Sequence, residues 1–550
     1  MMNASNPRPA DAVLLGGKIT TGVLGAVDAE AIAVRGDRVV AVGSIAEVAA
    51  LIGSHTSVVE LDGRRVIPGL IDSHVHVVRA GRSWNDEVRW GDVSSLAEGF
   101  ALIREALADV PSTGCIVVVG GWHPGQFDEQ RPPTPEELTE LSATVPIFVQ
   151  QQYDQAILNT AALEKCGIRG TEQVPFSGEV VRDASGNPTG IIKGQAAYAY
   201  CLELMMNQTL DRQIENTIAM QRDLNALGMT GAIDLGGASR MDAEAYRAVH
   251  EVHRRGAMTL RTRLFVHPRS GVDELDQIKD FINYLHPRFG DDFLRTVGIG
   301  EILFKGYYDG AGFTSIEISA ELKQRLREAT VLLAESGWTM NIHAIHDSSV
   351  RSILDVWEDV DVEIPLSDLR FSFSHADAIS DESLHRAKAL GAGIMVQDRM
   401  GMRTIDSAKA WGEDAVRHAP PLKTMLNLGL PIGGGTDATV AAPINPWRSL
   451  WWMVTGKPID GGITRDESER LTRAEALAAY TVGSAWFSFD DDRLGTLEVG
   501  KLADLAVLSE DYFEVSDDSI PFITSVLTVV GGNPVHHSTE WGGAATWSSE

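Results

Sequence analysis

Eight short apolar runs, spaced along the chain with helical patterns between the later ones, constrain the fold more than any other feature. The runs lie at 66–72, 230–235, 260–267, 297–305, 339–344, 370–375, 392–397 and 431–437. One helical pattern between them ends on Gly337, a residue type that commonly terminates helices. Strand–helix alternation predicts an α/β protein with a parallel sheet, and eight units fit a closed (β/α)8 TIM-like barrel.

Both ends of the chain follow another pattern. Residues 11–65 alternate apolar and polar side chains and break at Gly-Asp and Asp-Gly pairs, and the C-terminal segment does the same. This pattern is typical of short antiparallel strands joined by tight turns. We therefore predict a small β-sandwich composed of residues 1–65 and 495–550, with a barrel over residues 66–494.

A long segment separates the first two predicted barrel strands. It contains apolar runs and helical patterns of its own, so we predict an inserted α/β subdomain over residues 84–210. Because the segment follows the first strand, it leaves the barrel at the C-terminal rim, where barrel enzymes hold their active sites. We expect the insertion to roof the site.

Composition narrows the class of partner. The net charge is −29, with 76 acidic against 47 basic residues, which argues against nucleic acid or an anionic membrane as a partner. Three cysteines, Cys115, Cys166 and Cys201, form no CxxC pair, so a disulfide framework or a zinc–cysteine site is not expected. No apolar run approaches the roughly 18 residues of a membrane span. We expect a cytoplasmic protein that acts on a small molecule.

Reactive side chains end several predicted strands. They are His74 and His76 on strand one, Lys305 on strand four, His343 on strand five, His375 on strand six and Asp437 on strand eight. The C-terminal ends of barrel strands meet at one rim, so these side chains should converge. His74 and His76 are two apart and face the same side of a strand, which makes them a half-site for a metal. A single histidine at a strand end more often has a structural role than a metal-binding one. Six reactive side chains at strand ends are much less easily explained by chance.

These residues resemble a known family. "PGLIDSHVHV", the strand-four lysine, the later histidines and "GTDA" are similar to the metal-dependent amidohydrolase superfamily. The long insertion, "NTAAL", "KGYYDG", "HAIHD" and the closing "GTLEVGKLADLAVL" resemble the family-3 amidohydrolases. That group contains the N-substituted formamide deformylases and the YtcJ-like proteins. The resemblance covers nearly the whole chain, and its motifs are specific only in combination.

The resemblance implies a role for each matched residue. His74 and His76 match a first metal pair, and His343 and His375 match the histidines of a second metal. Lys305 matches a lysine that CO2 carbamylates in many relatives, so that it bridges a binuclear centre. Asp437 matches the aspartate that binds metal and shuttles the proton. The resemblance also implies a homodimer.

Physical chemistry is consistent with those roles. A metal lowers the pKa of bound water to about 7 and polarises a carbonyl, and a nearby carboxylate can pass the proton to a leaving amine. Zinc suits histidine and carboxylate ligands, although iron, manganese or cobalt would too, and one or two ions would fit. An unmodified Lys305 would instead form a salt bridge, for example with Asp309.

Three positions depart from the family pattern. His346 replaces the usual glycine, Ser374 replaces the usual glutamate, and Gln155 closes a "YDQ" where relatives often have Asp-Gly-His. The predicted metal ligands are unaffected. The departures point to a specialised substrate pocket.

Substrate-binding candidates lie near the predicted rim. Aromatic residues suit a pocket for small organic molecules, and arginines can hold a carboxylate. The alternative is that half of these aromatic residues belong to the hydrophobic core and that the arginines lie on the surface. The candidates are Trp122, Tyr307, His346, Arg399 and Trp447, with Arg403 beside Arg399. The "GGGT" before Asp437 lacks the ending of a phosphate-binding loop and is better explained by close backbone packing.

The sequence thus predicts a metal-dependent hydrolase that cleaves an amide, formamide, carbamate or cyclic amide by attack of metal-bound hydroxide. The same site could serve ester hydrolysis, deamination or decarboxylation. A catalytically silent binding or regulatory protein on the same barrel is the alternative from another class.

Overall fold

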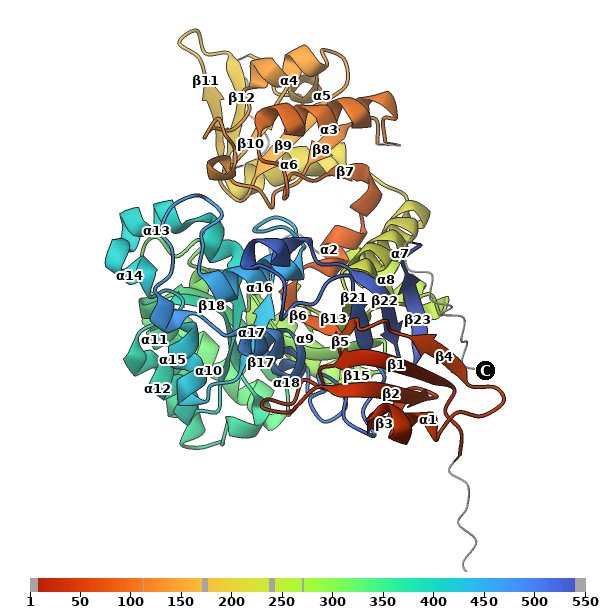
Figure 1. Ribbon diagram of the computed structural model, residues 1–550. Coiled ribbons are helices and arrows are strands. Elements are labelled where there is room, and N and C mark those ends of the chain that lie inside the picture. Colours follow the sequence, from red (N-terminus) through yellow and green to blue (C-terminus); the bar gives the residue numbers. More distant parts are fainter. Residues whose placement is uncertain (1–7, 112, 171–176, 237–242, 270–271, 540–550) are drawn as a thin grey trace, which may run out of the picture.

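The computed structural model describes residues 8–111, 113–170, 177–236, 243–269 and 272–539. These residues form three sheets: a barrel, a sheet that joins the two ends of the chain, and a sheet in the insertion. Figure 1 shows the insertion standing above the barrel, and the terminal sheet beside it, where the red N-terminal strands meet the blue C-terminal ones.

The barrel contains all eight predicted strands. They are β6 (Leu70–Val75), β13 (Met229–Asp234), β14 (Arg261–Val266), β16 (Leu294–Ile299), β17 (Thr339–His346), β18 (Ser372–Ala378), β19 (Gly393–Gln397) and β20 (Ile432–Gly435). Neighbours pair in parallel from β6 to β20. The first and last strands then meet through the backbone, where the Asp437 amide donates to the His74 carbonyl over 2.8 Å and the His76 amide to the Ala438 carbonyl over 3.0 Å. The predicted (β/α)8 fold is confirmed.

Helices follow most of the barrel strands. They include α7 (Leu210–Ala226), α8 (Arg247–Arg254), α9 (Glu274–Tyr284), α10 (Ala320–Glu335), α11 (Asp347–Asp361) and α12 (Asp381–Ala389). The predicted helix that ends on Gly337 is α10, whose first turn is capped by the Ser319 side chain. Gly337 follows it with φ +70°, a conformation that glycine adopts without steric cost. The apolar faces of α10 and α11 pack on the strands in the largest core.

The first predicted run, 66–72, proved to be two strands. Residues Arg65–Pro68 form β5 of the terminal sheet, and the barrel strand β6 begins only at Leu70. Gly69 separates them, and a Cβ there would lie 2.2 Å from the Thr230 side chain. The division follows from this close packing, because only glycine leaves enough room at the bend.

The terminal sheet joins the two ends of the chain. Its strands are β1 (Ala12–Ile19), β2 (Ala29–Arg35), β3 (Arg38–Gly43), β4 (Ser57–Glu60), β5, β21 (Leu505–Leu508), β22 (Ser525–Val530) and β23 (Asn533–His537). Hydrogen bonds connect them in the order β23-β22-β21-β5-β1-β2-β3, with β4 on β1. Arg65 of β5 is buried and forms ion pairs with Asp28 and Asp511. The N- and C-terminal segments therefore fold as one unit, while the exact domain boundaries stay a prediction.

The insertion has its own sheet and cores. Its strands are β7 (Glu87–Val88), β8 (Ile116–Val118), β9 (Ile147–Gln151), β10 (Gln155–Leu158), β11 (Glu179–Arg182) and β12 (Pro188–Lys193). Helices α3 (Leu96–Ala108), α4 (Pro135–Leu141), α5 (Thr160–Lys165) and α6 (Gln195–Met205) pack on this sheet. Two hydrophobic clusters, one containing Phe148 and one containing Trp122, fill the space between them.

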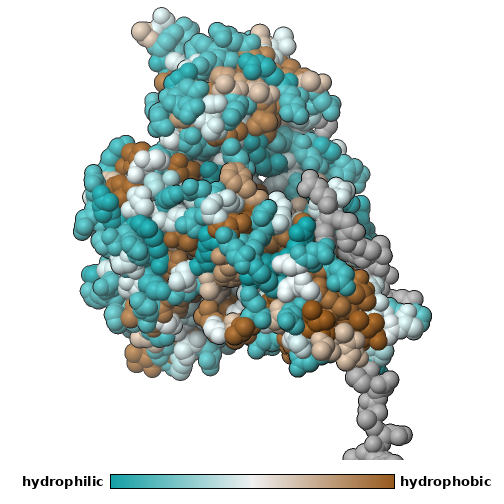
Figure 2. Space-filling model, viewed as in Figure 1, coloured by the Kyte–Doolittle hydropathy of each residue, from teal (hydrophilic) through white to brown (hydrophobic). Residues whose placement is uncertain are grey.

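One face of the molecule is mostly hydrophilic, with apolar patches over the terminal sheet (Figure 2). Figure 2 shows polar residues prevailing over the insertion and the barrel helices, and a narrowing of the molecule between the two. In the described part of the chain, none of the helices combines the length and the apolar character that crossing a membrane requires.

Candidate active site

His74, His76 and Asp437 meet where the barrel closes. The Nε2 atom of His76 lies 3.0 Å from Oδ1 of Asp437, and Nε2 of His74 lies 3.5 Å from the same oxygen. Asp72 fixes this seam, because its carboxylate accepts the His74 amide over 2.9 Å and the Thr436 hydroxyl over 2.7 Å. The side chains of β6 and β20 are thereby held in a fixed orientation.

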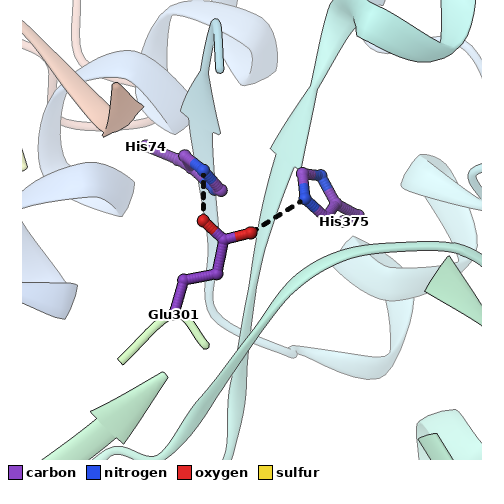
Figure 3. Close-up of side chains that lie close together, drawn as sticks. All are labelled: His74, Glu301 and His375. Carbon is purple, nitrogen blue, oxygen red and sulfur yellow. Dashed lines mark ion pairs between the residues drawn. The ribbon is translucent and has the colours of Figure 1, made fainter. Parts of the chain in front are cut away.

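Glu301 lies at the centre of the cluster. It follows β16 by two residues, and its amide donates to the Leu235 carbonyl over 2.9 Å. Its carboxylate lies between two imidazoles, with Oε2 at 3.2 Å from His74 and Oε1 at 3.5 Å from His375 (Figure 3). Oε1 also lies 2.7 Å from Nδ1 of His343. One carboxylate thus connects the histidines of three strands.

His343 and His375 have further partners. Nε2 of His343 lies 3.2 Å from the Asp309 carboxylate and 3.0 Å from the Gly310 carbonyl. Nδ1 of His375 accepts a hydrogen bond from Nε of Arg399 over 3.1 Å. Both ring nitrogens of His343 and of His375 are therefore contacted, those of His343 by two carboxylates and those of His375 by Arg399 and Glu301.

Lys305 requires a correction. The expectation was that strand four runs on to this lysine, but β16 ends at Ile299 and Lys305 lies in the short helix η4 (Lys305–Tyr307), where it is exposed. Gly300 ends the strand with φ +142°, and a Cβ there would lie 2.0 Å from the Asn341 carbonyl oxygen. The strand-end position that faces the histidines is therefore that of Glu301, and Asp309 pairs with His343 rather than with Lys305.

The electrostatics of the cluster follow from its pairing. Burial raises the pKa of a carboxyl group, but the neighbouring histidines outweigh it and hold the pKa values of Glu301 and Asp437 well below the usual range. Burial likewise opposes charge on His74, yet the two carboxylates raise its pKa to about 10. For His343 the opposing carboxylates raise the pKa to about 9. His375, buried beside the Arg399 guanidinium, has its pKa lowered to about 3.

The donor set fits a metal ion. Two overlapping groups have ligand atoms within 4.8 Å of one another: His74 with His76 and Asp437, and His74 with Glu301 and His375. Among the described residues, both ring nitrogens of His74 and Nδ1 of His76 are buried without a hydrogen-bond partner. Neutral imidazoles and carboxylates are the ligands that zinc and related ions prefer, and such unpartnered buried atoms would otherwise be costly.

A cavity of about 280 Å³ opens over the cluster. His76, Glu301, His343, His375 and Asp437 form part of its wall. The barrel also contributes Tyr308, Phe313, Arg399 and Arg403, and the insertion contributes Gln152, Tyr153, Asp154 and Gln195. Residues of the insertion and of the barrel therefore share the wall of one cavity.

Of the predicted substrate-binding residues, some line the cavity and others lie in hydrophobic cores. Arg399 lines the cavity, whereas Trp122, Tyr307 and Trp447 are buried in hydrophobic cores away from it. Trp122 stacks on Phe127 inside the insertion, and Nε1 of Trp447 donates to the Leu227 carbonyl. These aromatics fill cores because burying a large apolar surface is their main contribution. His346 caps the N-terminus of α11 and does not line the cavity.

Two residues of the cluster have an unusual backbone conformation. The φ angles are +74° for His375 and +55° for Asp437. Residues other than glycine rarely adopt this region, and such conformations are concentrated at functional sites. Surrounding contacts, including the Asp437–His74 backbone bond, hold them in place.

Both the sequence and the fold are similar to those of known amidohydrolases and related proteins. A model of the amidohydrolase family matches residues 57–536. The chain is 28% identical to the protein LONG AFTER FAR-RED 3 of Arabidopsis thaliana, over 96% of this chain and 92% of that protein. It is 24% identical to the N-substituted formamide deformylase of Arthrobacter pascens, over 92% of this chain and 94% of that one. An uncharacterized metal-dependent hydrolase from Pyrococcus horikoshii OT3 shares the fold, with a TM-score of 0.67 and 22% identity over 92% of this chain and 99% of that chain.

Proposed function

Because the chain belongs to the amidohydrolase family, we propose that it is a hydrolase that cleaves a carbon–nitrogen bond in a small organic substrate. The bond is an amide, formamide, carbamate or cyclic amide. The proposal rests on the convergence of four histidines with Glu301 and Asp437, all of which except His74 line one cavity. The similarity to a formamide deformylase supports the choice of bond.

Two groups of residues would hold metal. His74, His76 and Asp437 would form one position, and His74, Glu301 and His375 the other, with His343 beside Glu301. Zinc is the proposed ion, because imidazole and carboxylate are its usual ligands. When bound, such an ion acidifies water and polarises a carbonyl group.

Asp437 is the proposed proton carrier. Its neighbouring histidines keep the pKa of the carboxyl group low, so it is ionised at neutral pH and can accept a proton from the attacking water. Because the residue also lines the cavity, it can deliver that proton to the nitrogen of the leaving amine. A positioned carboxylate that acts in this way typically contributes a factor of about 10² to 10⁴ in rate.

The remaining cavity residues bind and orient the substrate. The Tyr308 ring lies beside that of His343, tilted by 43° and with ring centroids 4.6 Å apart, and Phe313 adds an apolar wall. The insertion covers the opening and limits access by water. A cavity of about 280 Å³ lies at the small end of the range for ligand sites, so we expect substrates of modest size.

The test combines metal content with product identity. Protein purified without chelator is analysed for metal and supplied with a panel of formamides, amides, carbamates, cyclic amides and esters. We expect bound metal and release of an amine, with turnover lost in Asp437→Asn and kept in Lys305→Ala, an exposed control. Release of ammonia, an alcohol or CO2 instead would indicate deamination, ester hydrolysis or decarboxylation. Metal binding without any turnover would favour a binding or regulatory role.

Two further expectations stay predictions. A homodimer would be recognised by its mass in solution, and a cytoplasmic location by fractionation of the native cell.

A further inference from the structure

A second cavity lies on the side of the barrel, between β14, β16 and the helices α8 and α9. Its volume is about 560 Å³, twice that of the cavity over the metal ligands. The two cavities share none of the lining residues that the structure describes. Barrel helices normally pack closely on their strands, so a space of this size in the helix layer can admit a ligand.

The walls are mostly aromatic and aliphatic. Tyr246, Leu264, Phe281 and Leu285 surround the interior, and Tyr284 and Phe289 are exposed at the edge, with 65% and 68% of their surface accessible. The polar Gln277 is fully engaged, since its amide group exchanges hydrogen bonds with the backbone of Arg269. The wall also contains the polar side chains of His250, His253, Arg269, Asp280 and Thr296. Its apolar part suits a flat aromatic body.

His267 provides the inner polar contact. It is only 7% exposed, and it directly follows β14. Its Nδ1 lies 2.9 Å from the Pro268 carbonyl oxygen, which can only accept, so Nδ1 carries the proton. Burial also lowers the pKa of His267, which keeps the ring neutral. Nε2 is therefore an acceptor, and it has no hydrogen-bond partner in the described part of the chain.

A buried acceptor without a partner is costly, and it indicates what the cavity would bind. From the apolar walls and the unpartnered Nε2 of His267, we propose that this cavity binds an aromatic molecule that donates a single N–H or O–H, such as a phenol or an aromatic amine. The donor bonds to Nε2 and the rings lie against Phe281 and Tyr246.

The site adjoins the metal ligands without being part of them. The Val266 carbonyl, one residue before His267, accepts the amide of Gly300, and the Glu301 amide bonds to Leu235. Val266 itself lines the second cavity. The proposal does not depend on the proposed hydrolysis, because binding is measured directly.

The test uses two probes that differ only in the donor, 2-naphthol and 2-methoxynaphthalene. Titration calorimetry is performed with the wild-type protein, His267→Phe and Asp437→Asn. We expect 2-naphthol to bind the wild type about tenfold more tightly than the methyl ether, the effect of one neutral hydrogen bond. In His267→Phe the two probes should bind equally. Asp437→Asn, altered in the other cavity, should bind both as the wild type does.

Three results would overturn the proposal. They are no binding of 2-naphthol, equal binding of both probes by the wild type, and loss of 2-naphthol binding in Asp437→Asn, which would assign the probe to the metal cavity. The comparison of probes on the wild type remains decisive even if His267→Phe does not fold. A dimer that blocks the probes would show that a second copy of the chain occupies this face instead.

Discussion

The Nε atom of Arg399 donates a hydrogen bond to Nδ1 of His375 over 3.1 Å. A guanidinium group cannot accept a hydrogen bond, so Nδ1 carries the lone pair and the proton of the neutral ring is on Nε2. That nitrogen faces Glu301 at 3.5 Å. To bind a metal through Nε2, His375 would have to lose this proton or break its bond with Arg399. The group of His74, His76 and Asp437 faces no such competition.

Arg399→Met should therefore increase the metal content. Without the guanidinium, Nδ1 can take the proton and Nε2 can bind metal, so we expect an increase from about one to about two ions per chain under limiting metal. Elemental analysis after dialysis measures the change. Arg403→Met is the matched control, because Arg403 lines the same cavity but bonds to Asp154 and Asp406. Two ions in the wild type, unchanged in Arg399→Met, would contradict the prediction.

Glu301→Gln should weaken metal binding. The amide keeps the shape of the side chain but removes the negative charge that His74, His343 and His375 surround. We expect a loss of affinity of at least about 100-fold, measured by competition with a chromophoric chelator. Lys305→Gln is the matched control and should leave the affinity unchanged, because Lys305 is exposed. If Lys305→Gln lost the metal and Glu301→Gln kept it, the carbamylated-lysine interpretation would return.

The sequence was sufficient to predict the barrel because the strands are buried on both faces. Such strands appear as short apolar runs, and each of the eight runs overlaps a barrel strand. The predicted ends of these strands were less accurate than their positions along the chain. Run 297–305 continues past β16, since "ILF" is as apolar as the strand, and this moved the predicted ligand from Glu301 to Lys305. The glycine before Glu301 was the available signal, because a glycine inside an apolar run often marks the end of regular pairing.

Aromatic residues were harder to place than charged ones. Asp437 and the histidines are at strand ends, and the barrel geometry brings strand ends together. Trp447 has no such constraint, because the helix α16 (Pro446–Thr455) could turn it either way, and it is buried in the core. The cavity residues Tyr308 and Phe313 lie in loops, whose course depends on contacts that sequence patterns do not specify.

Asp437→Asn should slow turnover more than it weakens metal binding. The amide can still offer an oxygen to a metal but cannot carry a proton, so we expect kcat to fall by about 10² to 10⁴. Metal content and kcat are measured on the same preparation with a substrate found in the panel. Asp309→Asn is the comparison, because Asp309 contacts His343 but does not line the cavity. Full turnover of metal-loaded Asp437→Asn would exclude the proton-carrier role.

The metal-free protein should lose stability in alkaline solution. The pKa values of His74 and His343 are raised to about 10 and about 9 in the folded protein. The stabilisation that these two charged histidines provide is therefore complete below the pKa of an unfolded histidine, about 6.5. It is lost as the pH rises through about 9 to 10. Glu301 and Asp437 have lowered pKa values, so the pH dependence of their stabilising effect has the opposite sign. That stabilisation is lost as the solution is acidified below about pH 4.

Thermal unfolding of chelator-treated protein between pH 5 and 10 measures this change. A His343→Gln variant should show a smaller alkaline decrease in Tm. Metal-loaded protein should also show a smaller decrease, because metal replaces the protons on its ligands. A Tm of the metal-free protein that stays level up to pH 10 would show that the histidines are not paired as charged groups.

The ion pair between Asp154 and Arg403 connects the roof of the cavity to the barrel. The two side chains are 3.0 Å apart, and the Arg403 guanidinium also lies 4.8 Å from the centroid of the Phe313 ring. Asp154 is exposed, so the pair should contribute only about 0.2–1 kcal/mol to stability. Its effect should instead appear in substrate binding. In Asp154→Asn we expect KM to rise about threefold to tenfold while Tm changes by less than about 2 °C.

Asp406→Asn is the matched control for this connection. Asp406 binds the same arginine over 3.1 Å, but it is in α13 (Thr404–Trp411) on the barrel side, so its loss does not detach the insertion. We expect its KM to stay near the wild-type value. If both variants raised KM equally, the charge of Arg403 rather than the connection to the insertion would govern binding. If neither did, the insertion would be held over the cavity by its other contacts alone.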